Sequence, residues 1–100
     1  MSTTGSSIRI GRLCMTESVL ALVRREIVDV LSLLERHAAG DWGSVSEARK
    51  EMNDADLAGQ REIISRYELT STVTIVIFTM ESCRITRCMQ LGEFLERDAI

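Results

Sequence analysis

The sequence predicts an α+β domain in which N-terminal helices pack on a three- to four-stranded antiparallel sheet, in the order β-α-α-α-β-β-β. Apolar side chains recur at three- and four-residue steps through residues 17–38, which is the spacing of one helix face. Residues 61–69, 72–80 and 83–91 instead have strand character, and the short linkers "TS" and "ES" between them predict an antiparallel meander.

The helical region is preceded by a stretch with strand-like alternation. Ile8–Met15 alternates apolar and polar side chains, and we expect it to add to the sheet as an edge strand. Thr16 is a candidate N-cap for the helical pattern that runs to Ala38. Periodicity leaves open whether this pattern is one helix or two with a break near Arg25. Gly40 follows the pattern where a C-cap glycine is expected.

The segment "GDWG" is a predicted turn that leads into a further helix. This helix begins at Ser44 or Ser46 and ends near Leu57, and Ser44 with Glu47 is favoured as the capping box. Its apolar side chains are few, so we expect most of its surface to be solvated.

Composition and charge narrow the class of protein. One hundred residues correspond to one domain, here residues 8–100 after a small, polar tail at 1–7 that we expect to be disordered. A net charge of −3 and a pI near 5.1 argue against general nucleic-acid binding, which needs a basic surface. The tail does not resemble a signal peptide, and the longest apolar run, "VTIVIF", is too short to span a bilayer. We therefore expect a cytoplasmic protein.

The cysteines favour reduced thiols over a metal site or a disulfide. Cys14, Cys83 and Cys88 form no CxxC pair, and a single histidine cannot complete a zinc site of the usual spacing. Cys83 and Cys88 fall on opposite faces of the predicted last strand, so we expect no disulfide between them. Cys88 is expected to be the more exposed of the two if the odd-numbered face is buried. We expect neither a metal nor a cofactor.

The order of motifs resembles a family of small bacterial proteins carried on plasmids, prophages and integrative elements. "RHAAGDWG" is similar to that family's "RHxxGDWG", and further matches follow it along the chain. The matching residues are Arg36, His37, Gly40, Asp41, Trp42, Gly43, Asn53, Asp54, Gly59, Arg61, Ser65, Tyr67, Thr79, Thr86, Glu93 and Phe94. The chain departs from the pattern at "TMESCR", where the family has "TEADRS", and at Leu91, where it has proline. The resemblance implies a mobile-element accessory protein with the same α+β order, and it supplies no catalytic mechanism.

"RHAAGDWG" holds the only histidine and the only tryptophan of the chain. His37 could act as a general base oriented by Asp41 or Glu47, but we favour a structural residue that bonds the carbonyls at the end of its helix. Trp42 could anchor a partner, but we favour a ring that covers the end of the core. Asp41 would then hold the corner as an N-cap or Asx turn. The residues assigned to this structural corner are His37, Gly40, Asp41 and Gly43.

The sequence shows no set of residues with the spacing of a known catalytic site. The leading hypothesis is therefore a non-enzymatic protein that acts by stoichiometric protein binding. Its most concrete form is an inhibitor of host defence, of the anti-CRISPR type, that blocks an effector complex through a basic surface. The residues expected to contact the partner are Glu47, Glu51, Asp54, Asp56 and, as an anchor, Trp42.

Other functions stay open at this point. A small nucleic-acid-binding regulator could use Arg61, Arg84 and Arg87 on the sheet, although only Tyr67 and Phe78 are available there for base stacking. A small hydrolase or nuclease could be built around His37. Homodimerisation through a sheet edge is a further alternative.

Overall fold

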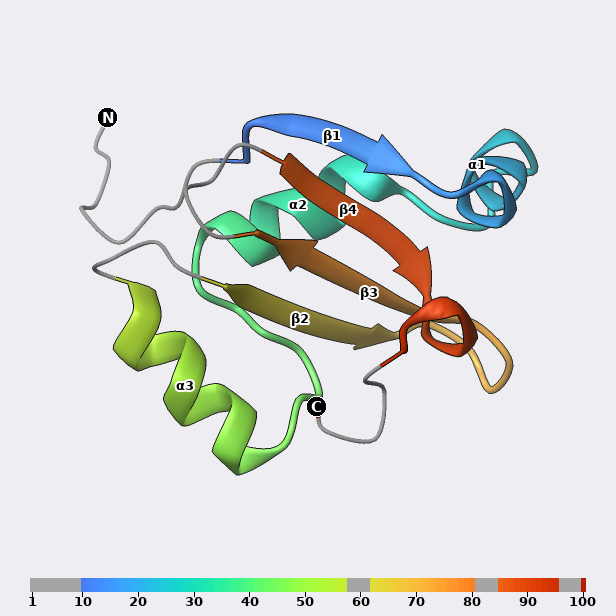
Figure 1. Cartoon of the computed structure of the whole chain (residues 1–100). Helices are drawn as coiled ribbons and strands as arrows, with labels where there is room; N and C mark the ends of the chain where they lie inside the picture. The colour runs from blue at the N-terminus through green and yellow to red at the C-terminus, as the bar shows by residue number, and fades with distance from the viewer. Residues whose placement is uncertain (1–9, 58–61, 81–84, 96–99) are drawn as a thin grey trace.

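The computed structural model describes residues 10–57, 62–80, 85–95 and 100, and it has the predicted α+β order (Figure 1). The expected tail at residues 1–7 lies outside this range. The elements are β1 (Arg12–Met15), α1 (Glu17–Arg24), α2 (Val30–Ala38), α3 (Glu47–Leu57), β2 (Ile63–Glu68), β3 (Thr74–Thr79), β4 (Ile85–Gln90) and a 3₁₀ turn, η2 (Leu91–Glu93).

The sheet has the strand order β1-β4-β3-β2, so β1 is an edge strand as expected. The meander is antiparallel: β2 pairs with β3 and β3 with β4. The prediction of a wholly antiparallel sheet is wrong for β1, which runs parallel to β4 with Arg12 opposite Ile85. No hairpin joins these two strands, because three helices and two strands separate them in the chain. The turn signals of the sequence therefore carry no information on their relative direction.

The helical region divides into two helices at the position that periodicity left open. Thr16 caps α1 by accepting a hydrogen bond from the backbone of Val19. α1 ends in a Schellman motif, in which the N–H of Ile27 bonds the carbonyl of Leu22 at 2.9 Å. Glu26 has the left-handed conformation that this motif requires, with a φ of 61°. The chain turns there and begins α2 under the sheet.

The start of α3 differs from the favoured prediction. Ser46 is the residue that caps this helix, since its Oγ accepts the N–H of Arg49 at 3.1 Å. Ser44, expected as the cap, instead donates its backbone N–H to the carbonyl of Arg66 at 2.8 Å. Pairing with the edge of β2 therefore takes precedence over the local capping box.

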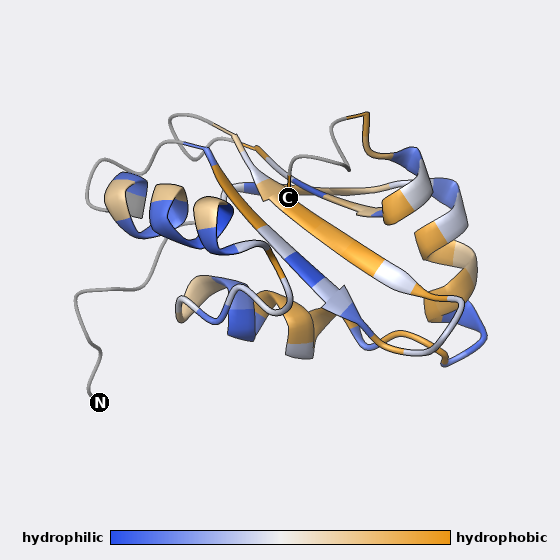
Figure 2. Ribbon diagram, turned by 90° about the horizontal axis from the view of Figure 1, so that it is seen from below, coloured by the Kyte–Doolittle hydropathy of each residue, from blue (hydrophilic) through white to orange (hydrophobic). Residues whose placement is uncertain are grey.

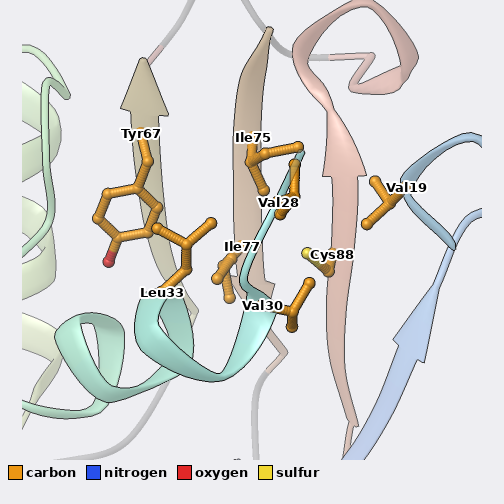
Figure 3. Packing of buried hydrophobic residues seen from close by; sticks show 8 residues of the cluster. All are labelled: Val19, Val28, Val30, Leu33, Tyr67, Ile75, Ile77 and Cys88. Atoms are coloured by element: carbon orange, nitrogen blue, oxygen red, sulfur yellow. The ribbon is translucent and has the colours of Figure 1, made fainter. Parts of the chain in front are cut away.

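The main core lies between the sheet and the helices α1 and α2 (Figure 3). Leu33 of α2 packs beside Tyr67 of β2, while Val30 lies near Cys88 of β4. Ile75 and Ile77 of the central strand β3 complete this layer and are fully buried. The hydrophobic colour along β3 contrasts with the mainly hydrophilic α3 (Figure 2).

The opposite face of the sheet is covered in part by the C-terminal segment. Ile64, Val76 and Met89 pack there against Phe94 and Ile100. Both faces of β4 are therefore buried in part, and Cys88 is fully buried on the helix side. Cys88 was expected to be the more exposed cysteine if the odd-numbered face were the buried one, but α1 and α2 cover the even-numbered face of β4, which carries Cys88. Cys83 lies outside the described residues.

Candidate functional site

His37 is fully buried in the last turn of α2 and faces the sheet. Its Nδ1 lies 2.6 Å from Ser65 Oγ on β2, and its Nε2 lies 2.8 Å from Thr79 Oγ1 on β3. Thr79 Oγ1 is in turn 2.8 Å from Thr86 Oγ1 on β4, and Thr86 donates to the carbonyl of Ile10 at 2.6 Å. The His37 side chain thus links α2 to β2 and β3. The expectation that it bonds the carbonyls at the end of its own helix is wrong.

This chain of hydrogen bonds has one consistent direction. The carbonyl of Ile10 can only accept, so the Thr86 hydroxyl must donate to it, and the Thr79 hydroxyl must donate to Thr86. Thr79 Oγ1 therefore accepts from His37 Nε2–H, and in a neutral ring Nδ1 accepts from Ser65. The ring is held in the neutral Nε2–H form. Burial lowers the pKa of His37 to about 4, which agrees with a neutral imidazole at physiological pH.

The geometry does not favour the alternative in which His37 is a general base. Ser65 lies within hydrogen-bond reach of the ring, but both side chains are fully buried. Asp41, the carboxylate expected to orient the ring, is instead bound to Arg36, with Arg36 Nε to Asp41 Oδ2 at 2.7 Å. A general base must reach a substrate proton, and this imidazole has no exposed surface.

The residues after α2 form a tight corner. Gly40 has a φ of 88° just beyond the end of the helix, where a Schellman glycine is found. Asp41 forms an Asx turn by accepting the N–H of Gly43 at 3.1 Å, and its carbonyl accepts the Tyr67 hydroxyl at 2.7 Å. Arg36 lies over the Tyr67 ring, 4.5 Å from its centroid, and lowers the pKa of Asp41 by hydrogen bonding.

Trp42 points into this corner and is only 4% exposed. Its ring packs against Ile63 and meets the His37 ring edge-on, with centroids 6.0 Å apart. The indole Nε1 donates to Asp54 Oδ1 on α3 at 3.0 Å. The structure therefore corrects the assignment of Trp42 as an anchor for a partner, because the ring covers the end of the core.

The outer edge of β2 is closed by side chains of α3 that were not predicted from the sequence to have this role. Asn53 is fully buried, donates to the carbonyl of Ile64 at 2.7 Å and accepts its N–H at 3.2 Å. Arg49 bonds Asn53 Oδ1 at 3.1 Å and the carbonyl of Glu62 at 3.3 Å. Arg66 is covered by the GDWG corner, where its N–H bonds the carbonyl of Trp42 at 3.0 Å. The signal in the sequence is a polar pair at a four-residue step, Arg49 and Asn53, on a helix with few apolar side chains.

The predicted acidic contact residues all lie on α3. Glu47, Glu51 and Asp54 are exposed, and Asp56 is half-buried. Asp54 is partly engaged, because one of its oxygens accepts the Trp42 indole. The remaining carboxylates make no ion pair within the described part of the chain. Glu47 and Glu51 are one turn apart on the exposed side of the helix, whereas Asp56 lies on the other side, nearer to the buried Arg49 and Asn53. The helix itself stands beside the β2 edge (Figure 1).

The arginines proposed for nucleic-acid binding are only partly described. Arg61 and Arg84 lie outside the described residues, and Arg87 is exposed on the face of the sheet opposite the helices. Tyr67, one of the aromatic residues expected to stack on bases, is buried beneath Arg36. A hollow of about 450 Å³ on the Arg87 face is floored by apolar side chains, including Phe78 and Met89.

Within the described residues there is no group of three or more histidine, cysteine, aspartate or glutamate side chains placed to hold a metal ion. None of the helices among them is both long enough and apolar enough to cross a membrane. Comparisons with family models, with curated proteins and with solved structures find no match to this chain.

Proposed function

We propose that this protein acts by stoichiometric protein binding, and that the exposed acidic side of α3 is its contact surface. The observation that carries this proposal is the way α3 is attached to the domain. Among its described side chains only Arg49 and Asn53 are buried, and both are polar. A helix with so little apolar contact contributes little to a core, so its solvated side is available for another molecule.

The contacts of α3 hold this surface in a defined position. Asn53 and Arg49 bond the edge of β2, and Asp54 receives the Trp42 indole. Glu47 and Glu51 are one helical turn apart, so their carboxylates project on the same side. Because the helix is fixed at several points, binding would require little ordering of these residues.

A surface of this charge fits a partner with a basic face. The net charge of −3 adds long-range attraction to such a partner. The resemblance to mobile-element proteins suggests a host defence complex, of the CRISPR effector kind, whose basic surface normally holds nucleic acid. Inhibition would then follow from occupancy of that surface and would need no catalysis.

A pull-down from host cytosol, followed by mass spectrometry and titration against the purified partner, tests this proposal. We expect a protein with a basic face, bound more weakly as salt rises, and weakened at least about tenfold by Glu47→Lys with Glu51→Lys. The matched control is Glu26→Lys with Glu35→Lys, which changes the net charge equally at exposed residues away from α3. Equal effects of both pairs, or recovery of nucleic acid without protein, would contradict the proposal.

A further inference from the structure

The two edges of the sheet differ in how their backbone groups are satisfied. At the β2 edge, Asn53 bonds the N–H and the carbonyl of Ile64, while the carbonyl of Trp42 accepts the N–H of Arg66 and the N–H of Ser44 donates to the Arg66 carbonyl. At the other edge, β1 pairs with β4 on one side only. Within the described residues, no strand lies on the outer side of β1 (Figure 1). An unpaired strand edge of this kind is a template for one more strand.

The backbone groups that face outward on β1 can be assigned from its pairing. The N–H of Thr16 donates to the carbonyl of Cys88 on β4 at 3.1 Å. Because successive residues of a strand direct their N–H and C=O groups to alternate sides, Cys14 also faces β4. Leu13 and Met15 therefore direct their backbone groups away from the sheet.

The side chains of β1 are apolar on the helix side of the sheet and include an exposed arginine on the other side. Leu13 packs against the main core on the helix side, and Met15, two residues on, shares that side and is 37% exposed. Arg12 is opposite Ile85, and Cys14 is opposite Arg87, so these residues share the other side of the sheet. Arg12 and Arg87 are both exposed, and neither forms an ion pair with a carboxylate of the described residues.

We propose that β1 binds an extended segment of another protein, in which acidic residues alternate with apolar ones, as a fifth strand. The backbone of Leu13 and Met15 would supply the hydrogen bonds. The acidic side chains of the segment would lie near Arg12 and Arg87, and its apolar side chains near Met15, as alternation along a strand requires. This surface is separate from the acidic side of α3 and takes the opposite charge.

The charges favour such a segment over a second copy of this chain. Antiparallel pairing of two β1 strands would gather Arg12 and Arg87 of both copies on the same side of the joined sheet, with no ion-paired carboxylate of the described residues to offset their charge. β1 also has only four residues, which offers a short interface for a stable dimer.

The test uses the full chain labelled with ¹⁵N and a blocked eight-residue peptide that alternates glutamate with valine. We expect saturable shifts of the Leu13 and Met15 amide signals, with little change at Ile64 and Arg66 on the closed edge. Arg12→Glu should weaken binding at least about fivefold, whereas Lys50→Glu, the same charge change on α3, should leave it unchanged.

A second variant tests the backbone contact itself. Met15→Pro removes an outward N–H and leaves the bond from Thr16 to β4 in place, so we expect this variant to lose binding of the glutamate–valine peptide. Equal binding of a lysine–valine peptide, the absence of saturable shifts, or a dimer mass in solution would overturn the proposal. Glu47→Lys with Glu51→Lys should not affect this peptide, so the proposals for β1 and for α3 fail independently.

Discussion

Thr79 Oγ1 accepts the Nε2–H of His37 at 2.8 Å and directs its own hydrogen to Thr86, also at 2.8 Å. The hydroxyls of β3 and β4 thereby determine the tautomer of a histidine on α2. A second proton on the ring would sit on Nδ1, against Ser65 Oγ, in a fully buried site. The domain is therefore built around a neutral imidazole.

The first prediction concerns the protonation of this ring. We expect ¹⁵N-detected NMR at pH 7 to show the Nε2–H tautomer, with the His37 pKa near the value of about 4 that burial produces. A ring signal that titrates near the ordinary 6.5 would contradict the assignment.

The second prediction is a pH dependence of stability that depends on His37. Between pH 6.5 and about 4 the unfolded chain binds a proton at this residue and the folded chain does not, so stability falls as pH falls through this window. The full loss is about 3.5 kcal/mol, from about 1.4 kcal/mol per pKa unit. Asp41 has a pKa below its ordinary 3.8, so its contribution disappears at lower pH.

Urea unfolding at a series of pH values measures this effect. His37→Gln supplies a neutral side chain that does not titrate, and we expect its stability to be nearly flat between pH 6.5 and 4. Parallel slopes in the original protein and this variant would assign the effect to other groups.

The third prediction tests how α3 closes the sheet. Asn53→Leu keeps a side chain of similar size but leaves the N–H and C=O of Ile64 without their partner, so we expect a loss of about 2–4 kcal/mol. Met52→Ala, at the neighbouring exposed residue, should change stability by no more than about 0.5 kcal/mol. Similar losses for both variants would show that Asn53 has no special role.

The elements were predictable from the sequence because each depends on local patterning. Helix periodicity, the Thr16 cap and the turn residue Gly40 act over a few residues, and the structure has them where they were expected. The partners of His37 and Asn53 were not predictable, since Ser65 and Ile64 lie 28 and 11 residues away and meet them only after the sheet has formed. The parallel direction of β1 was not predictable for the same reason, since its partner β4 is distant in the sequence.

Trp42 is the only tryptophan of the chain, and its burial shows that a rare residue type need not mark a functional site. Its flanking residues Asp41 and Gly43 predicted a turn, and the turn is present. Whether the ring faces inward depends on Asp54 and Ile63, which belong to other elements. The two rare residues of the "RHAAGDWG" stretch, His37 and Trp42, therefore join elements of the fold, whereas Arg36 and Asp41 beside them are exposed.

The fourth prediction concerns the glycine of the corner. Gly43 has a φ of 73°, and a Cβ there would lie 2.1 Å from the carbonyl oxygen of Arg66. Gly43→Ala should therefore cost about 2–4 kcal/mol, because neither backbone can move without breaking the pairing with β2. Gly92→Ala is the matched control, since nothing lies within 4 Å of the added Cβ. Thermal unfolding should separate the two variants clearly, and equal melting temperatures would contradict the close approach.

The last prediction is a stabilising substitution at the break between α1 and α2. Glu26 is a non-glycine residue with a φ of 61°, at the position of a Schellman motif that usually holds glycine. Its side chain is exposed, so Glu26→Gly relieves the strain of the left-handed conformation without removing a buried contact. We expect a gain of about 0.5–1 kcal/mol in the free energy of unfolding.

Glu35→Gly, the same change at an exposed position inside α2, should lose about 1 kcal/mol, because glycine is unfavourable within a helix. Opposite signs for one substitution at two exposed glutamates would show that backbone conformation, and not the lost charge, determines the effect; a loss at both positions would contradict the left-handed assignment of Glu26.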